Sequence, residues 1–217
     1  MKISIVIPNW NGIGKIEKNL PAALKVKGVD EVILVDDAST DQSVEIIKKN
    51  FPEIKLLWQK ENKGFSATVN FGVKEAQGEI VYLLNNDAKP SEDSLIRVLD
   101  HFGSKKVFSV GCNTGGNWSW AKFENGFFWH FMTPQLGKPA VHQTLWASGG
   151  SGVFRKNIWE SLGGFDEIYK PFYEEDVDLG YRATKRGYIN IWEPASFVEH
   201  HMEPGVISQH HSRLEIS

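Results

Sequence analysis

The chain has 217 residues, of which 41% are hydrophobic and 24% charged, and its formal net charge is -3 at pH 7. Such a composition is that of a globular protein long enough to bury one core, and it excludes a chain disordered over most of its length. The slightly acidic balance and the lack of a long basic run argue against a nucleic-acid partner, because nucleic-acid-binding proteins usually carry a basic face.

The single cysteine, Cys112, excludes a disulfide within the chain and favours a reducing compartment. No stretch approaches the ~18 apolar residues that a membrane-spanning helix needs, and the first residues are apolar too briefly for a signal peptide. We therefore expect a cytoplasmic protein, with peripheral contact at the cytoplasmic face of the membrane if its substrate is lipid-linked.

Short apolar runs alternate with amphipathic patterns in the first half of the chain. The runs end at turn residues and predict buried parallel strands over Lys2–Ile7, Glu31–Val35, Ile54–Trp58, Glu79–Leu84 and Val107–Val110. The intervening patterns predict helices over Ile13–Lys27, Asp41–Asn50, Ser66–Ala76 and Ser91–Phe102. We expect a kink or restart at Pro21 in the first helix and a cap from Ser39 or Thr40 on the second. This alternation predicts an α/β fold with a mostly parallel sheet, helices on both faces, and ligands beyond the carboxyl ends of the strands.

The second half differs in character. From Asn113 to Leu145 the chain is rich in Trp and Phe without a helical period, which predicts irregular strands and loops. Helices are expected over Arg155–Leu162 and Glu174–Arg186, and short strands over Ile189–Trp192 and Ser196–Val198. Since no repeat or low-complexity tract separates the halves, one mixed domain over residues 1–217 is expected.

Four carboxylates gather within five residues where the last predicted helix begins, namely Glu174, Glu175, Asp176 and Asp178. Acidic residues are favoured at a helix N-terminus, so a structural role is one interpretation. The other is a general base that removes a proton from an acceptor hydroxyl group.

Three further segments follow predicted strands. Asp87 could join a divalent cation to a diphosphate or simply belong to a turn. Asp36 and Asp37 could accept hydrogen bonds from a base or ribose, or cap the next helix. Lys63 and Gly64 could present a cation and backbone amides to an anion, or only start a helix.

A nicotinamide cofactor is not expected. The segment from Asn11 to Glu17 comes one glycine short of a dinucleotide fingerprint, because Glu17 stands where the third glycine should be.

Taken in order, these segments resemble the family 2 glycosyltransferases of the GT-A fold. The motifs that carry the resemblance are IVIPNWNG, VDDASTD, NKGFSATVNFG, LLNNDA, ASGGSGVFRK, GGFDE and FYEEDVDLGYRATKRG, spanning about residues 2–201. NND, with Asn86 where the family often has an acid, is similar to the rhamnosyltransferase-like subgroup of bacterial surface-polysaccharide enzymes.

The resemblance implies a role for each matching residue. Residues 1–112 would form the nucleotide-binding half, with Pro8, Asn9, Trp10, Asn11, Asp36, Asp37, Lys63, Gly64 and Asn86 at the nucleotide. Residues 113–217 would form the acceptor and catalytic half. There Asp176 would be the base with Glu175 beside it, and Trp146, Gly149, Gly150, Gly152, Glu174 and Arg182 would lie near the sugars. Asp87 and His200, or His201 in its place, would hold Mg²⁺ or Mn²⁺; the alternative is a surface histidine pair.

The resemblance also implies an inverting transfer from a UDP- or dTDP-sugar to a glycan or lipid-linked acceptor. Aromatic residues between Trp118 and Trp146 could meet that acceptor, or form a small core under a long loop. Two rival functions are a sugar-nucleotide pyrophosphorylase and an inactive nucleotide-sugar-binding module. The first is disfavoured because the turn after the first strand, PNWNG, lacks that class's Gly-rich, Arg-bearing loop.

Overall fold

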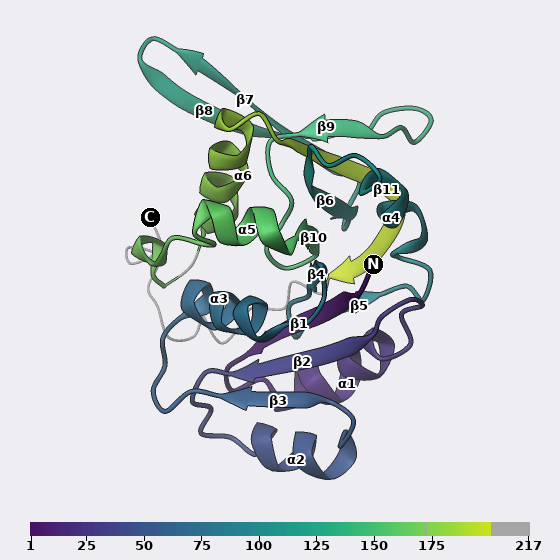
Figure 1. The fold of residues 1–217 in the computed structure, drawn as a ribbon, viewed down its shortest axis with the longest axis vertical. Coiled ribbons are helices and arrows are strands. Elements are labelled where there is room, and N and C mark those ends of the chain that lie inside the picture. The colour runs from purple at the N-terminus through teal and green to yellow at the C-terminus, as the bar shows by residue number, and fades with distance from the viewer. Residues whose placement is uncertain (172, 201–217) are drawn as a thin grey trace.

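The computed structural model of the chain describes residues 1–171 and 173–200. Within them, one mixed sheet has nine strands in the order β3-β2-β1-β4-β10-β6-β11-β5, with β9 paired to β11 (Figure 1). The strands are β1 (Ile3–Asn9), β2 (Glu31–Asp36), β3 (Lys55–Trp58), β4 (Ile80–Leu83), β5 (Ala88–Pro90), β6 (Val107–Asn113), β9 (His142–Thr144), β10 (Gly152–Arg155) and β11 (Ile189–His200).

β1 to β4 pair in parallel, as do β6 and β11, whereas β5, β9 and β10 run antiparallel to their neighbours. Because β10 and β6 continue the sheet that β1 to β4 begin, both halves of the chain contribute to one sheet.

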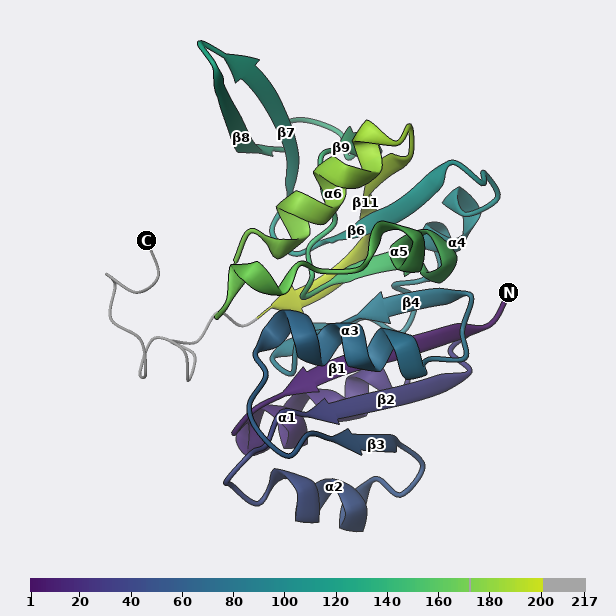
Figure 2. The same ribbon diagram turned by 60° about the vertical axis from the view of Figure 1, so that its left-hand side comes forward.

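Helices cover both faces of this sheet (Figure 2). They are α1 (Ile13–Ala23), α2 (Ser43–Asn50), α3 (Phe65–Glu75), α4 (Ile96–His101), α5 (Lys156–Leu162) and α6 (Glu175–Lys185), with a 3₁₀ turn at Glu167–Tyr169. One buried cluster includes apolar side chains of α1, α2 and α4, and a second includes those of α3, α5 and α6. The predicted fold class is therefore confirmed. Among the described residues, no helix is long and apolar enough to cross a membrane.

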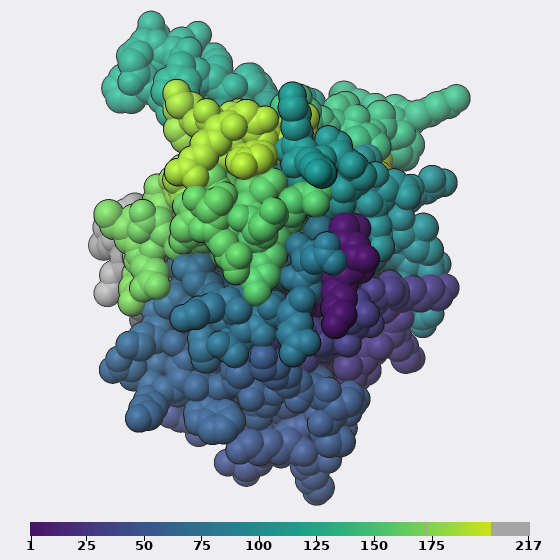
Figure 3. Space-filling model, in the orientation of Figure 1, coloured from purple at the N-terminus to yellow at the C-terminus, as the bar shows by residue number. Residues whose placement is uncertain are grey.

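The aromatic segment is more regular than predicted. β7 (Asn117–Glu124) and β8 (Phe127–Pro134) form a hairpin that projects from the body of the protein (Figures 1 and 3). Its turn is Asn125-Gly126, with φ of 54° and 83°. Two successive residues at positive φ suit the right-handed twist of a hairpin with a two-residue turn. The Asn-Gly dipeptide therefore indicates a hairpin in the sequence, and the sequence analysis did not predict one.

Several predicted boundaries were wrong. α1 ends at Ala23 instead of Lys27, and Pro21, where a kink or a restart was expected, lies inside it without a restart. The two predicted C-terminal strands are one strand, β11, whose irregular register between Glu193 and Phe197 accommodates Pro194. α4 begins at Ile96, five residues after the predicted start, and β5 and β10 were not predicted.

The predicted cap on α2 was also wrong. Neither Ser39 nor Thr40 caps this helix, which begins after Gln42. The Asp41 carboxylate instead accepts a hydrogen bond from the Ser43 amide at 3.0 Å. Ser39 is turned toward the ends of β1 and β2, where it joins the site.

Candidate active site

Asn9 connects the carboxyl ends of β1, β2 and β4. Its amide nitrogen donates to Asp36 Oδ1 at 3.0 Å, and its amide oxygen accepts from Asn86 Nδ2 at 2.8 Å. Because Asn9 Oδ1 needs a donor, an amide at position 86 fits where a carboxylate would bring only acceptors. This contact gives a physical reason for the amide of Asn86.

Asp36 organises the turn after β2. The carboxylate is 2% exposed and accepts from the Ser39 amide at 2.9 Å and the Ser39 hydroxyl at 2.6 Å, besides Asn9. Ser39 Oγ in turn accepts a hydrogen bond from the backbone amide of Asn11 at 2.8 Å. Asp36 therefore holds the loops after β1 and β2 against each other, next to Pro8 in β1 and to Trp10.

Asp37 joins the end of β2 to the beginning of α3. Its carboxylate accepts from the Lys63 amide at 2.7 Å, the Gly64 amide at 2.9 Å and Gln59 Nε2 at 2.8 Å. Burial raises the pKa of Asp37, and the amides of Lys63 and Gly64 partly offset that rise. The Lys63 ammonium itself pairs with Glu61 at 2.7 Å. Gln59 was absent from the predicted site.

Asp87 and His200 are in direct contact. β5 and β11 pair so that Ala88 lies opposite His200, which puts His200 Nε2 3.0 Å from Asp87 Oδ1. The other oxygen, Oδ2, lies 3.2 Å from the Lys15 ammonium, a neighbour that was not predicted. Burial alone would raise the pKa of Asp87, but the His200 hydrogen bond and the charge of Lys15 outweigh it and lower that pKa.

These two side chains fit a divalent cation that takes its remaining ligands from a substrate. One carboxylate oxygen and one imidazole nitrogen meet at one point, and Mg²⁺ or Mn²⁺ sites often use few protein ligands plus phosphate oxygens. Within residues 1–171 and 173–200, no group of three or more His, Cys, Asp or Glu side chains could hold a metal. The alternative His201 lies outside the described residues.

A pocket of about 310 Å³ opens beside Asp87. Besides Asp87, its lining comes from the beginning of α1 and the loop before it: Asn11, Gly12, Gly14, Lys15, Lys18 and Asn19. Two lysines and the first backbone amides of an eleven-residue helix suit an anionic ligand.

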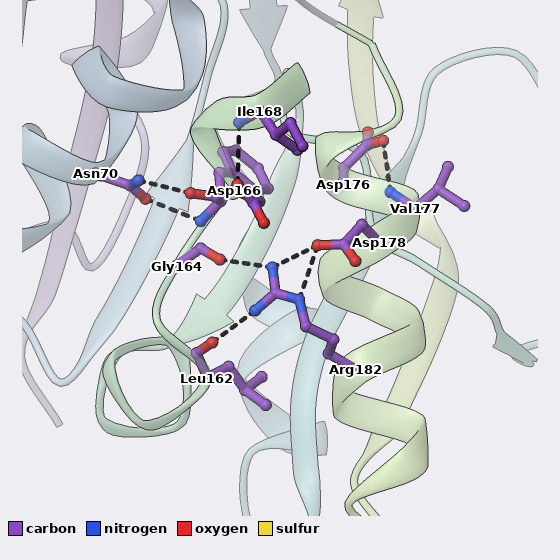
Figure 4. A network of polar contacts seen from close by, with 10 residues as sticks. Asn70, Leu162, Gly164, Asp166, Ile168, Asp176, Val177, Asp178 and Arg182 are labelled. Carbon is purple, nitrogen blue, oxygen red and sulfur yellow. Dashed lines mark hydrogen bonds and ion pairs between the residues drawn. The ribbon is translucent and has the colours of Figure 1, made fainter. Parts of the chain in front are cut away.

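On the other side of the site, Asp176 lies in the first turn of α6 (Figure 4). Its carboxylate accepts from the Gly149 amide at 3.1 Å and the Val177 amide at 2.8 Å. Burial raises the pKa of Asp176 above its ordinary value, and these two amides counteract part of the shift. A half-buried carboxylate with a raised pKa is a stronger base than one free in water.

Glu175 is 5% exposed, and its Oε2 has no hydrogen-bond partner among the residues that the structure describes. Burial, followed by the charge of Asp176, raises the pKa of Glu175 to about 7. Tyr173 and Glu174 just before it have φ of 80° and 72°, a conformation that is costly for residues with a side chain. Glu174 also lies 3.3 Å from His130 of the hairpin, whose ring meets the Trp146 ring edge-on at 5.5 Å.

The loop after β9 connects the two groups. Gly149 donates to Asp176, and the neighbouring Gly150 carbonyl accepts from the Asn85 amide at 2.9 Å, two residues before Asp87. A Cβ at Gly150 would lie 2.6 Å from the Asn85 side chain, and one at Gly152 would lie 2.5 Å from the Ser148 carbonyl oxygen. Gly150 thus permits close packing of the loop against the end of β4, and Gly152 permits the tight turn within the loop.

Arg182, which was predicted to lie near a sugar, ties α6 to the loop after α5 in this structure (Figure 4). Its guanidinium pairs with Asp178 at 2.6 Å and donates to the carbonyls of Leu162 at 2.6 Å and Gly164 at 2.8 Å. With its donors committed in this way, Arg182 supports the helix that carries Asp176.

Fold and site together define a GT-A-type α/β domain with a polar rim at the carboxyl ends of its strands. The model of the protein family described as "Glycosyl transferase family 2" matches residues 4–163 of the chain. The chain belongs to glycosyl transferase family 2, which confirms the predicted family and enzyme class.

Among curated proteins, the chain is 27% identical over 190 residues to the O-antigen biosynthesis protein RfbC of Myxococcus xanthus, covering 79% of this chain and 15% of that protein. It is 26% identical over 204 residues to an N-acetylglucosaminyl-diphospho-decaprenol L-rhamnosyltransferase of Mycobacterium tuberculosis, covering 78% and 66%. The chain thus spans less than two thirds of the length of these relatives.

Two solved structures share the fold. A mannosyltransferase from Pyrobaculum calidifontis in complex with GDP-Man and Mn²⁺ has a TM-score of 0.72 at 19% identity, covering 93% of this chain and 57% of that one. S. aureus TarS 1-349 in complex with UDP-GlcNAc has a TM-score of 0.65 at 20% identity, covering 89% and 59%.

Proposed function

We propose that this chain transfers a sugar from a UDP- or dTDP-sugar to a glycan or lipid-linked acceptor, with inversion at the anomeric carbon. The observation that carries the proposal is the connection between the Asp87–His200 pair and Asp176 through the 149–150 loop. This arrangement can hold a leaving diphosphate on one side and a general base on the other.

The nucleotide would lie along the ends of β1 and β2. Trp10 could stack on a base, and the turns fixed by Asp36 and Asp37 would set the shape of the pocket around Pro8, Asn9 and Asn11. The diphosphate would enter the 310 Å³ pocket beside Asp87. Residues 1–112 would then form the nucleotide-binding half and residues 113–217 the acceptor and catalytic half of one domain.

Asp87 and His200 would hold Mg²⁺ or Mn²⁺, which when bound supplies a positive charge that stabilises the leaving diphosphate. Solved structures of the same fold contain Mn²⁺ with a nucleotide or nucleotide sugar, which supports this assignment. Asp176 takes the proton from the acceptor hydroxyl group. The oxygen of that hydroxyl attacks the anomeric carbon from the face opposite the diphosphate, and the bond between the sugar and the diphosphate breaks.

The acceptor would lie along the wall that the hairpin and α6 form together. Phe123 and Phe128 pack beside Tyr181 of α6, at ring distances of 6.1 and 5.1 Å. Trp146, His130 and Glu174 continue this wall toward Asp176. Aromatic faces pack against the C–H faces of sugars, and the polar groups could orient hydroxyls. The name of the mycobacterial relative, which acts on a diphospho-decaprenol, supports a lipid-linked acceptor.

The test compares wild type, Asp176→Asn and Asp178→Asn, supplied with radiolabelled UDP- and dTDP-sugars and a bacterial lipid extract. Wild type should label the lipid fraction, and Asp176→Asn should lower that rate by roughly 10²-fold or more, because general-base catalysis contributes about that much. Asp176→Asn should still bind UDP in calorimetry. Asp178→Asn is the matched control, since its carboxylate pairs with Arg182, and it should stay within a few-fold of wild type.

Other results would contradict the proposal in different ways. Full turnover by Asp176→Asn would remove Asp176 as the base. Formation of nucleoside triphosphate from donor and pyrophosphate would indicate a pyrophosphorylase, and donor binding without any product would indicate an inactive binding module.

A further inference from the structure

Lys15 occupies a position that concerns the same metal site. It lies in the first turn of α1, and its ammonium is 3.2 Å from Asp87 Oδ2. Both side chains are largely shielded, at 23% and 17% exposed, unlike the surface pair Lys27–Asp93 at 61% and 60%. The Lys15–Asp87 attraction is therefore weakly screened by solvent.

Both oxygens of Asp87 are covered by groups of the chain itself, Lys15 on Oδ2 and His200 on Oδ1. A divalent cation bound to Asp87 would have the Lys15 ammonium as an immediate like-charged neighbour. Cations so close repel strongly in a partly buried site, so metal binding requires Lys15 to move away from Asp87 or to share a new anion with the metal.

The structure offers Lys15 a second position. Lys15 and Lys18 line the 310 Å³ pocket, and so does Asn19, one turn further along the same face of α1. The pocket therefore gives the Lys15 ammonium room to turn away from Asp87 toward an anion bound beside α1.

We propose that Lys15 is the resident counter-cation of Asp87 in the nucleotide-free protein and moves to the donor diphosphate when donor and metal bind together. Lys15 then weakens metal binding to the free protein and strengthens binding of the nucleotide-metal complex. This inference rests on the proposed function, because the diphosphate is the anion that receives Lys15.

Calorimetric titration tests the exchange without measuring activity. MnCl₂ is titrated into nucleotide-free wild type, Lys15→Met, Lys15→Arg and Lys18→Met, and UDP is then titrated at saturating MnCl₂. Lys15→Met should bind Mn²⁺ at least about tenfold more tightly than wild type and UDP at least about tenfold more weakly. Lys15→Arg keeps the charge and should retain weak Mn²⁺ binding, and Lys18→Met should leave Mn²⁺ affinity unchanged because Lys18 does not contact Asp87. Tight Mn²⁺ binding by Lys15→Met should be lost on adding Asp87→Asn.

Equal Mn²⁺ affinity in nucleotide-free wild type and Lys15→Met would overturn the inference, as would undiminished UDP binding by Lys15→Met. Absence of the nucleotide site would look different, since wild type itself would then bind neither UDP nor a nucleotide sugar at any MnCl₂ concentration. A failure of sugar transfer alone would appear in the labelling assay and leave these titrations unchanged.

Discussion

The Glu175 carboxyl group is deeply buried beside the Asp176 carboxylate, and burial, followed by the charge of Asp176, raises its pKa from 4.5 to about 7. A carboxyl whose pKa is higher in the folded state stabilises the fold below its unfolded pKa, and this stabilisation is lost as the pH rises through the folded pKa. Glu175 should therefore destabilise the protein above about pH 7 relative to a neutral side chain.

Glu175→Gln should match wild type near pH 4 and exceed its stability above about pH 8 by on the order of 3 kcal/mol, or roughly 6 to 12 °C in Tm. Thermal unfolding of both proteins across this range measures the difference. Glu160→Gln is the control, because the Glu160 side chain is 55% exposed. The stability difference between Glu160→Gln and wild type should not vary with pH. A Glu175→Gln difference that is constant with pH would contradict the buried-acid interpretation.

Sequence reasoning proposed candidate-site residues that directly follow strands but not the neighbours that contact them in the structure. Asp37 and Asp87 could be found because ligands collect at the carboxyl ends of parallel strands. Lys15 and Gln59 could not be found in this way. Lys15, for example, is 72 residues from Asp87 in the sequence, and only the tertiary fold brings Lys15 and Asp87 together. Arg182 has the chemistry of a sugar or phosphate ligand, and its use as a tether depends on carbonyls exposed by the end of α5.

The hairpin of β7 and β8 is the element that extends furthest from the sheet, and its two faces differ. Cross-strand pairs put Phe123 and Phe128 on the face beside α6, and Trp120, Phe131, Trp129 and Phe127 on the opposite face. Phe127 and Trp129 on this outer face are 65% and 49% exposed. Aromatic side chains favour the interface between water and lipid, so this face suits contact with a membrane that carries a lipid-linked acceptor.

Substituting both Phe127 and Trp129 by Ser should reduce flotation with liposomes of bacterial lipids by roughly tenfold or more, since about 1.4 kcal/mol of lost binding suffices for that. Ile96→Ser is the matched control, because Ile96 is 52% exposed on α4 and should not alter flotation. If wild type never enters the lipid fraction, the outer face does not bind membranes and a water-soluble acceptor is favoured.

Element types were predicted better than element boundaries. The strands of the first half are continuous buried apolar runs, a pattern that identifies them directly. β5 and β10 were missed because three- and four-residue strands carry too little pattern, and they are strands here because β11, β4 and β6 offer them edges. Pro194 is visible in the sequence as a residue that interrupts strand pairing. Whether the strand continues past Pro194 with an irregular register depends on the strands that pair with it.

At the scale of the whole molecule, one sheet spans the halves that the sequence assigns to nucleotide and acceptor. β10 lies between β4 and β6, so neither half has a separate sheet, and buried clusters on both faces draw side chains from the two halves. Elements packed into shared cores should unfold together. A ligand bound at the rim of the first half should then stabilise the entire chain.

Thermal unfolding should accordingly show one transition, and UDP at about 100 times its Kd with MnCl₂ should stabilise the protein by about 2.7 kcal/mol, or roughly 5 to 11 °C. Chelation of the metal by EDTA should remove most of that shift, because the Asp87–His200 pair would no longer connect the diphosphate to the protein. Two transitions, with only the first raised by UDP, would show that the halves unfold separately in spite of the shared sheet. A single transition that UDP raises equally with and without EDTA would instead keep the nucleotide site and remove the metal from it.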